Sequence, residues 1–307
     1  MALIEPPAHL SAEAAQFLRE APEVPQIDYS DHAGIAALRD EIHAEWLQLN
    51  AQMTEPYAHR SEAIEGVPVD WFASTEADLE SSRVILHLHG GSYFCGTPET
   101  NASMIVPVAR RTGLPVVSVD YRLAPEHPFP AAIDDCCAVA TSLVESHDVV
   151  AMYGESAGGG LALATAVALR DAHAALPQRL GLLSPWCDLT SSGDTIRTLL
   201  GVDPDFPHPD EPDAAARMYA GAEVVDPRAS PLFADLADLP PTLIQVGGRE
   251  ILLSDSIRTA QSMRRAGTEV TLDVWDGLWH VWQLWHHVPE AVQAFDELAE
   301  FLVPTAQ

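Results

Sequence analysis

The chain of 307 residues is 47% hydrophobic, which allows a sizeable core and excludes a protein that is disordered throughout. Its formal net charge is −29, from 45 acidic and 16 basic residues, and every basic residue is Arg. Such a charge excludes nucleic acid and anionic membranes as expected partners. Two explanations of the charge stay open, a genome that avoids Lys codons and adaptation to high salt.

Apolar runs alternate with helical patterns along most of the chain. Several runs are almost continuously apolar, which is typical of strands buried on both faces. The alternation predicts an α/β fold with a mainly parallel sheet of about eight strands flanked by helices. The clearest expected strands are Val67–Ala73, Arg83–His89, Val116–Tyr121, Val149–Tyr153, Leu180–Ser184, Thr242–Val246 and Val270–Trp275, and the clearest expected helices are Asn101–Thr112, Ala131–Ser146, Ala157–Ala174, Ser254–Ala266 and Pro289–Leu302.

Two segments depart from this alternation. The first runs from Met1 to about Met53 and has amphipathic patterns at Ala12–Arg19 and Ile35–Leu49. The second runs from Asp188 to about Ala229, is rich in Pro and Asp, and has a short helical pattern near Ala214–Tyr219. Both segments fit surface decoration, and in an enzyme with its site above the sheet they are also natural material for a lid.

The four Cys residues have spacings that match no zinc-binding pattern, and we expect them to be small buried side chains of a reduced protein. Residues Met1–Glu20 lack the basic region and apolar run of a secretory signal. No stretch approaches the roughly 20 apolar residues of a membrane span. We therefore predict a cytoplasmic protein without a membrane partner.

The sequence Gly-Glu-Ser-Ala-Gly at residues 154–158 stands between a predicted strand and a predicted helix. A Gly-x-Ser-x-Gly motif in this setting is typical of the nucleophile elbow, a strained turn that exposes a serine hydroxyl at a helix N-terminus. A chance match is the alternative, but the flanking strand and small-residue helix favour the functional interpretation. We predict that Ser156 is a nucleophile and that Glu155 anchors the turn through hydrogen bonds.

A second glycine motif follows the predicted strand that starts at Arg83. Acyl transfer needs preorganised donors for a developing oxyanion, and consecutive glycines let backbone N–H groups face the substrate. We predict that the donors are the N–H groups of Gly90, Gly91 and Ala157. We expect His89 to hold the glycine loop rather than to act as the base.

Several segments together resemble the bacterial branch of the hormone-sensitive lipase family of esterases. They are His89-Gly90-Gly91, Tyr121-Arg122-Leu123-Ala124-Pro125-Glu126, Gly154-Glu155-Ser156-Ala157-Gly158-Gly159, Ser184-Pro185-Trp186 and Ala229-Ser230-Pro231-Leu232. The resemblance runs from about Val67 to the C-terminus. It implies an α/β-hydrolase fold, a helical cap built partly from the N-terminus, and hydrolysis of short acyl esters. We accordingly assign residues 1–60 to an N-terminal cap segment and residues 61–307 to the catalytic domain, with 188–229 as a cap insertion.

The base and the acid follow from the order Ser, acid, His that this fold uses. His280 follows the last predicted strand, at the position that matches the family's catalytic histidine. For the acid, Glu250 occupies the matching position, although the family usually has Asp there, and Asp255 is the alternative. Ser92 stands where the family usually has a third glycine, a change that we expect to narrow the pocket without removing the oxyanion donors.

Three aromatic residues flank these motifs, namely Tyr93, Trp186 and Trp279. They are candidates for the walls of the substrate pocket. Plain core packing is an equally good interpretation of each, because aromatic side chains usually pack.

The sequence therefore predicts a serine carboxylesterase that hydrolyses short-chain acyl esters through an acyl-enzyme. A lactone hydrolase, a non-catalytic ligand receptor and an amidase are the alternatives. The expected partner is a small ester or lactone, no metal or cofactor is implied, and a homodimer stays open.

Overall fold

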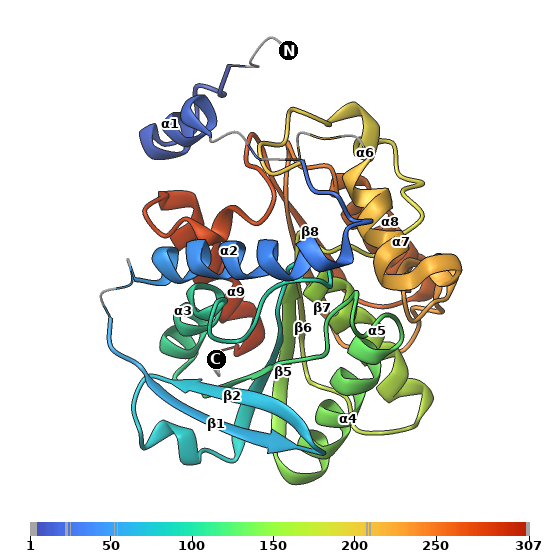
Figure 1. Cartoon of the computed structure of the whole chain (residues 1–307). Helices are drawn as coiled ribbons and strands as arrows, with labels where there is room; N and C mark the ends of the chain where they lie inside the picture. The colour runs from blue at the N-terminus through green and yellow to red at the C-terminus, as the bar shows by residue number, and fades with distance from the viewer. Residues whose placement is uncertain are drawn as a thin grey trace.

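The computed structural model describes residues 5–21, 24, 26–51, 53, 55–206, 208 and 210–304. They form one sheet of eight strands in the order β1-β2-β4-β3-β5-β6-β7-β8 (Figure 1). β2 pairs antiparallel with β1 and with β4, and all other neighbours are parallel, as the sequence predicts for most of the sheet. The strands are β1 Ala58–Ile64, β2 Val67–Ala73, β3 Arg83–Leu88, β4 Val116–Val119, β5 Asp148–Glu155, β6 Leu180–Leu183, β7 Thr242–Gly247 and β8 Val270–Trp275.

The first strand, β1, is missing from the strands named above. Its sequence, Ala-His-Arg-Ser-Glu-Ala-Ile, is largely polar, and most of its side chains are exposed because it lies at the edge of the sheet. The turn that joins it to β2 has positive φ at both central residues, 53° at Glu65 and 81° at Gly66. Two-residue turns of this kind match the twist of paired strands, so the turn rather than an apolar pattern defines this hairpin.

Helices cover both faces of the sheet. Helices α3 and α9 pack on one face around a cluster that includes Ile85 and Phe295, and α4, α5 and α8 pack on the other (Figure 1). The helices are α1 Ala12–Glu20, α2 His32–Asn50, α3 Ala102–Thr112, α4 Ala131–Ser146, α5 Ala157–Asp171, α6 Thr195–Thr198, α7 Glu211–Ala220, α8 Leu253–Ala266 and α9 Pro289–Leu302. Short 3₁₀ helices occupy Asp78–Glu80, Gly221–Val225, Pro231–Phe233 and Trp282–Leu284.

The N-terminal helix α1 is fastened to the C-terminal part of the chain. Its cap residue Ser11 donates from its backbone N–H and from Oγ to the carboxylate of Glu290, each over 2.7 Å. Phe17 stacks on Trp279 with 4.1 Å between ring centroids. Because these contacts join residues more than 260 positions apart, α1 is an integral part of the fold.

Helix α2 crosses the molecule above the carboxyl ends of the central strands (Figure 1). Arg39 on α2 holds it to the catalytic core, donating to Glu126 over 2.8 Å and to the carbonyl of Phe94 over 2.6 Å. The loop before α2 also meets α7, because the N–H of Ile27 donates to Glu211 over 3.0 Å. Of the helices described, none has the length and apolar character to cross a membrane.

Candidate active site

Ser156 occupies the sharp turn between β5 and α5. Its backbone has φ 55° and ψ −121°, a strained conformation for a residue with a side chain, and such strain is concentrated at functional sites. Gly158 explains why the motif needs glycine, since a Cβ there would lie 2.0 Å from the carbonyl oxygen of Leu88. The predicted strand, turn and helix are therefore present, and they place the serine at the carboxyl edge of the sheet, where it lines a cavity.

His280 lies beside the serine. Its Nε2 is 3.0 Å from Ser156 Oγ, within the reach of a general base. The imidazole is buried, and the ring of Phe206 packs on it edge to face, with 5.1 Å between centroids. The loop after β8 thus brings together two side chains that are 124 positions apart.

Glu250 is the acid that faces His280. Its Oε1 is 3.6 Å from Nδ1 of the imidazole, and the side chain is completely buried. The other oxygen, Oε2, accepts hydrogen bonds from Ser184 Oγ over 2.7 Å and from the N–H of Gly247 over 2.9 Å. Two fixed donors on one oxygen hold the other oxygen toward the imidazole.

Ser184 has a structural role here that the sequence does not reveal. Its hydroxyl donates to Glu250 and accepts from the N–H of Val281 over 3.2 Å. One side chain therefore positions both the loop of the acid and the loop of the base. Ser184 belongs to the Ser-Pro-Trp segment quoted for the family resemblance, and that was the only signal for it.

Asp255, the alternative acid, points elsewhere. Its Oδ2 accepts from the backbone N–H groups of Cys187 and Asp188 over 3.0 and 2.9 Å. Burial raises the pKa of Asp255 to about 8, and the negative charge of Asp188 adds to the rise. Asp255 therefore holds the segment after β6 in place, and the geometry favours Glu250 as the acid.

The electrostatics of the site favour a charged imidazole. Burial alone lowers the pKa of His280, but the facing carboxylate of Glu250 and the charges of Asp203 and Asp205 outweigh it, and the pKa is raised overall. Asp203 is completely buried and accepts a hydrogen bond from the N–H of Ile251 over 3.1 Å. Burial raises the pKa of Asp203 to about 6 and that of Asp205 to about 8. Neither carboxyl is predicted from the sequence, because both lie in the irregular segment after α6.

The prediction that Gly90 donates to the oxyanion is wrong, because its N–H already donates to Glu155 Oε1 over 2.6 Å. Oε2 of the same carboxylate lies 2.8 Å from Nε2 of His87, so Glu155 anchors the glycine loop to the elbow, as predicted. His89 holds the same loop, with Nδ1 2.8 Å from the carbonyl oxygen of Gly90. The loop then runs through positive φ at Gly91, Ser92 and Tyr93.

The N–H groups of Gly91, Ser92 and Ala157 have no hydrogen-bond acceptor among the residues that the structure describes. Gly91 and Ser92 line the cavity that holds Ser156, and Ala157 follows Ser156 at the start of α5. Gly91 must be glycine, since a Cβ there would lie 2.1 Å from the carbonyl oxygen of Cys95. The open donors of the loop therefore start one residue later than predicted.

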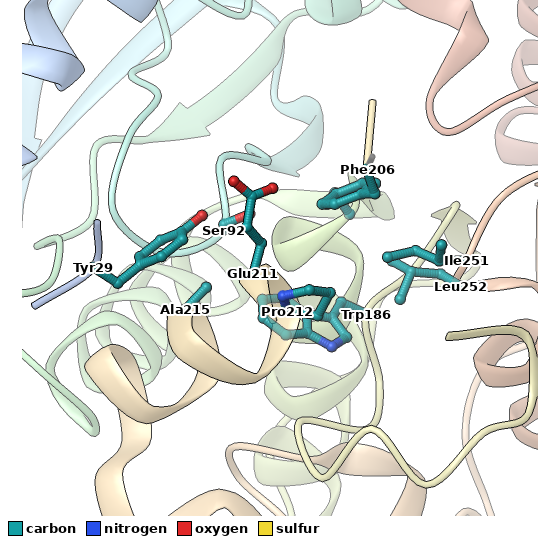
Figure 2. Close-up of a pocket in the computed structure, with 10 residues that line it drawn as sticks. Tyr29, Ser92, Trp186, Phe206, Glu211, Pro212, Ala215, Ile251 and Leu252 are labelled. Carbon is teal, nitrogen blue, oxygen red and sulfur yellow. The ribbon is translucent and has the colours of Figure 1, made fainter. Parts of the chain in front are cut away.

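Two cavities that share part of their lining flank Ser156. A narrow one of about 10 Å³ is lined on one side by Trp186, Ile251 and Leu252 (Figure 2). A wide one of about 590 Å³ is lined by the glycine loop, by α2 and by His280. The serine hydroxyl thus stands between a small enclosed space and a large open one.

Of the three aromatic candidates, Trp186 lines the narrow cavity, and Tyr93 and Trp279 line neither of the two cavities beside Ser156. For the other two the alternative of core packing applies, because both side chains are buried in packing contacts. Tyr93 stacks on Tyr219 of α7 with 3.8 Å between centroids, and Trp279 stacks on Phe17 of α1. Both rings hold the N-terminal and inserted segments to the core.

A strained serine in a strand-to-helix turn, a histidine within hydrogen-bond reach and a buried carboxylate beyond it define a hydrolase. Residues 85–284 match the family model described as the alpha/beta hydrolase fold, and the chain belongs to this family. It is 36% identical to an esterase of Acinetobacter venetianus, over 74% of this chain and 76% of that protein. It is 38% identical to an acetyl-hydrolase of Streptomyces hygroscopicus, over 73% of this chain and 76% of that one.

Solved structures agree with this assignment. An esterase from the bacterial hormone-sensitive lipase family superposes with a TM-score of 0.83 at 35% identity, covering 92% of this chain and 94% of that one. Esterase E25 superposes with a TM-score of 0.86 at 29% identity, covering 99% and 97%. The predicted family resemblance and fold class are confirmed, and the protein is an esterase. The alternative of a receptor without catalysis is thereby removed.

Proposed function

We propose that the protein is a serine carboxylesterase in which Ser156 is the nucleophile, His280 the base and Glu250 the acid that orients the base. The observation that carries this assignment is the 3.0 Å separation of Ser156 Oγ and His280 Nε2 at a strained elbow. The 3.6 Å separation of Nδ1 and Glu250 Oε1 is slightly longer than a hydrogen bond. Such contacts are often loose in the absence of substrate and tighten when it binds.

The oxyanion is bound, in this proposal, by the N–H groups of Gly91, Ser92 and Ala157. What supports it is that these groups have no acceptor within the described part of the chain. Their position beside Ser156, at the N-terminus of α5, also favours negative charge. The substitution of Ser for the third glycine does not remove a donor, because the donor is the backbone.

The reaction proceeds in two halves. His280 takes the proton of Ser156 as Oγ bonds to the ester carbonyl carbon, and the oxyanion forms. The bond to the alcohol oxygen then breaks, and that oxygen takes the proton from His280, which leaves an acyl-serine. In the second half His280 takes a proton from water, the hydroxyl attacks the acyl carbon, and Ser156 Oγ recovers the proton as the acid leaves.

The two cavities fit the two parts of a substrate. The departing alcohol must receive its proton from His280, which lines only the wide cavity. The alcohol therefore occupies the wide cavity, and the acyl group points into the narrow one against Trp186. A space of about 10 Å³ holds roughly one water-sized group, so we infer a preference for acetyl and other short acyl groups.

The cap is also part of the proposal. We assign it to residues 1–60 and 188–229, of which residues 1–4 and a few others lie outside the described part. Phe17 of α1, Trp46 of α2 and Glu211 of α7 all line the wide cavity, which supports a role of both segments in binding the alcohol.

Substitution of the nucleophile tests the mechanism. Ser156→Ala removes the attacking oxygen and should lower the hydrolysis of p-nitrophenyl acetate by at least about 10³-fold, since removing any triad member costs orders of magnitude. The matched control is Ser61→Ala on the exposed edge strand β1, which should be as active as the native enzyme. A folded Ser156→Ala variant with a tenth or more of the native activity would refute the assignment.

A further inference from the structure

The wide cavity has acidic side chains and, among its described lining residues, no Arg. Its acidic members are Glu45, Glu155, Asp205 and Glu211, and the imidazole of His280 also lines it. Glu155 is held by the glycine loop and His87 and is not available to a ligand. The other three carboxyls come from the cap segments and face the space assigned to the alcohol.

Glu211 is the most informative of these residues. It is the first residue of α7, it is only 5% exposed, and it lines both the wide and the narrow cavity. Its Oε1 accepts a hydrogen bond from the N–H of Ile27. Its Oε2 accepts none from the residues that the structure describes. Figure 2 shows the carboxylate reaching toward Ser92, on the same side as the hydroxyl of Tyr29.

A carboxylate in this position lacks the compensation that buried charges usually have. Burial raises the pKa of Glu211, and the hydrogen bond from the N–H of Ile27 and the nearby His208 only partly oppose the rise. The Arg side chain of α2, Arg39, is already bound to Glu126 and to two backbone carbonyls. A buried carboxylate without a cationic partner is costly, and a positively charged ligand would supply the missing partner.

Aromatic rings form much of the remaining wall. They are Phe17, Tyr29, Trp46, Phe94, Phe206 and Trp285. Aromatic faces attract ammonium groups, and sites that bind quaternary ammonium compounds combine such faces with nearby negative charge. The apolar rings also accept the alkyl groups around the nitrogen.

An acidic surface alone would mean little in a chain with 45 acidic and 16 basic residues. Exposed residues such as Glu45 are explained by that composition. That composition does not explain the buried carboxylate of Glu211, which is open on one oxygen to a cavity lined by aromatic rings. It is this side chain that distinguishes a binding site from a generally acidic protein.

We propose that the wide cavity selects esters whose alcohol part carries an ammonium group, which Glu211 and the aromatic rings bind while Ser156 attacks the acyl carbon. The inference rests on the proposed esterase function and names the substrate class of the same site. The net charge of −29 acts in the same direction, because a negative field concentrates cationic substrates.

Two acetate esters of nearly identical shape test the proposal. Acetylcholine carries a quaternary nitrogen where 3,3-dimethylbutyl acetate has a quaternary carbon, so the pair differs in charge alone. We expect kcat/KM for the cationic ester to exceed that for the neutral one by about tenfold or more at low salt. If either ester turns over too slowly to measure, the same pair is compared as inhibitors of p-nitrophenyl acetate hydrolysis, with the same expected ratio.

Glu211→Gln removes the charge and keeps an acceptor for Ile27. It should lower the cationic-to-neutral ratio by about tenfold and change the rate on the neutral ester by less than about threefold. Glu41→Gln on the outer surface of α2, which lines neither cavity, is the matched control and should leave the ratio unchanged.

The outcomes separate the two levels of the proposal. If the native enzyme has a cationic-to-neutral ratio of kcat/KM near one, the ammonium preference is overturned, even if the Glu211 variant does not fold. The preference is also overturned if Glu211→Gln leaves the native ratio unchanged. Absence of Ser156-dependent hydrolysis of p-nitrophenyl acetate would instead overturn the esterase mechanism itself.

Discussion

Replacing Glu250 by Gln probes the acid without changing the size of the side chain. The structure determines how the amide would sit. Ser184 Oγ and the N–H of Gly247 both donate to Oε2, over 2.7 and 2.9 Å, so the amide oxygen must take that place. The amide NH₂ then faces Nδ1 of His280, which has to accept instead of donate. The proton of the neutral imidazole moves to Nε2, the atom that must receive the proton of Ser156.

The loss of rate depends on the free energy needed to turn the amide over, which would restore the active tautomer of His280. Turning the amide over would break both hydrogen bonds to Oε2, at about 1–3 kcal/mol for each buried donor left unsatisfied. A total of about 2–6 kcal/mol corresponds to roughly 30-fold to 10⁴-fold in rate. Loss of the charge that stabilises the imidazolium adds to it, and the equivalent change in an unrelated serine protease costs about 10⁴. We therefore expect kcat to fall by about 10³ to 10⁴.

The assay is the steady-state hydrolysis of p-nitrophenyl acetate, together with thermal unfolding of each variant. Asp255→Asn is the control, because an amide oxygen can still accept from Cys187 and Asp188, and it should keep most of the native kcat. The melting temperature of Glu250→Gln should stay within a few degrees of the native value, since its hydrogen bonds are retained. A Glu250→Gln enzyme within tenfold of native, or an inactive but folded Asp255→Asn enzyme, would refute the reasoning.

Three further predictions concern substrate length, pH and salt. Hydrolysis of p-nitrophenyl esters should fall steeply from acetate and butyrate to acyl chains beyond roughly eight carbons. Trp186→Ala widens the narrow cavity and should shift the optimum to longer acyl chains. Equal native rates on the butyrate and palmitate esters would contradict the short-chain preference. Activity should rise with pH as His280 loses its proton. The midpoint of the pH profile of kcat/KM should lie above the pKa of about 6.5 of a free imidazole, because the pKa of His280 is raised. A midpoint below that pKa would contradict the prediction. The melting temperature should increase from low to molar sodium chloride, because screening relieves repulsion among the surplus carboxylates, and a flat or falling curve would leave codon usage as the explanation of the acidic composition.

The parts of the site that the sequence predicts are those written in short contiguous motifs. The elbow is local, because Gly158 and its neighbours are required by contacts within one strand, turn and helix. The donors of the glycine loop were misplaced by one residue because the partner of Gly90, the carboxylate of Glu155, is 65 positions away. The same limit applies to Ser184, whose two partners lie 66 and 97 positions along the chain.

The prediction of the fold from the sequence was limited in a similar way. Buried parallel strands such as β3 are apolar and were recognised from composition, whereas β1 is exposed, polar and defined by a turn. The sequence also left open whether Tyr93 and Trp279 line the pocket or pack in the core, because motif position shows where a residue stands in the chain but not which of two neighbouring surfaces its ring contacts. The two rings instead stack on Tyr219 and Phe17, which come from the inserted and N-terminal segments.

The attachment of α1 beside the catalytic loop has a practical consequence for handling the enzyme. Phe17 of α1 lines the wide cavity and stacks on Trp279, the residue before His280, so a tag or surface linker placed ahead of α1 would disturb the wall of the cavity directly. Helix α9 begins near that wall and runs down one face of the sheet to Leu302, away from the cavity (Figure 1). Immobilisation through the end of α9 should therefore leave the cavity undisturbed. Because the chain has no Lys for amine coupling, attachment at that helix is the better choice.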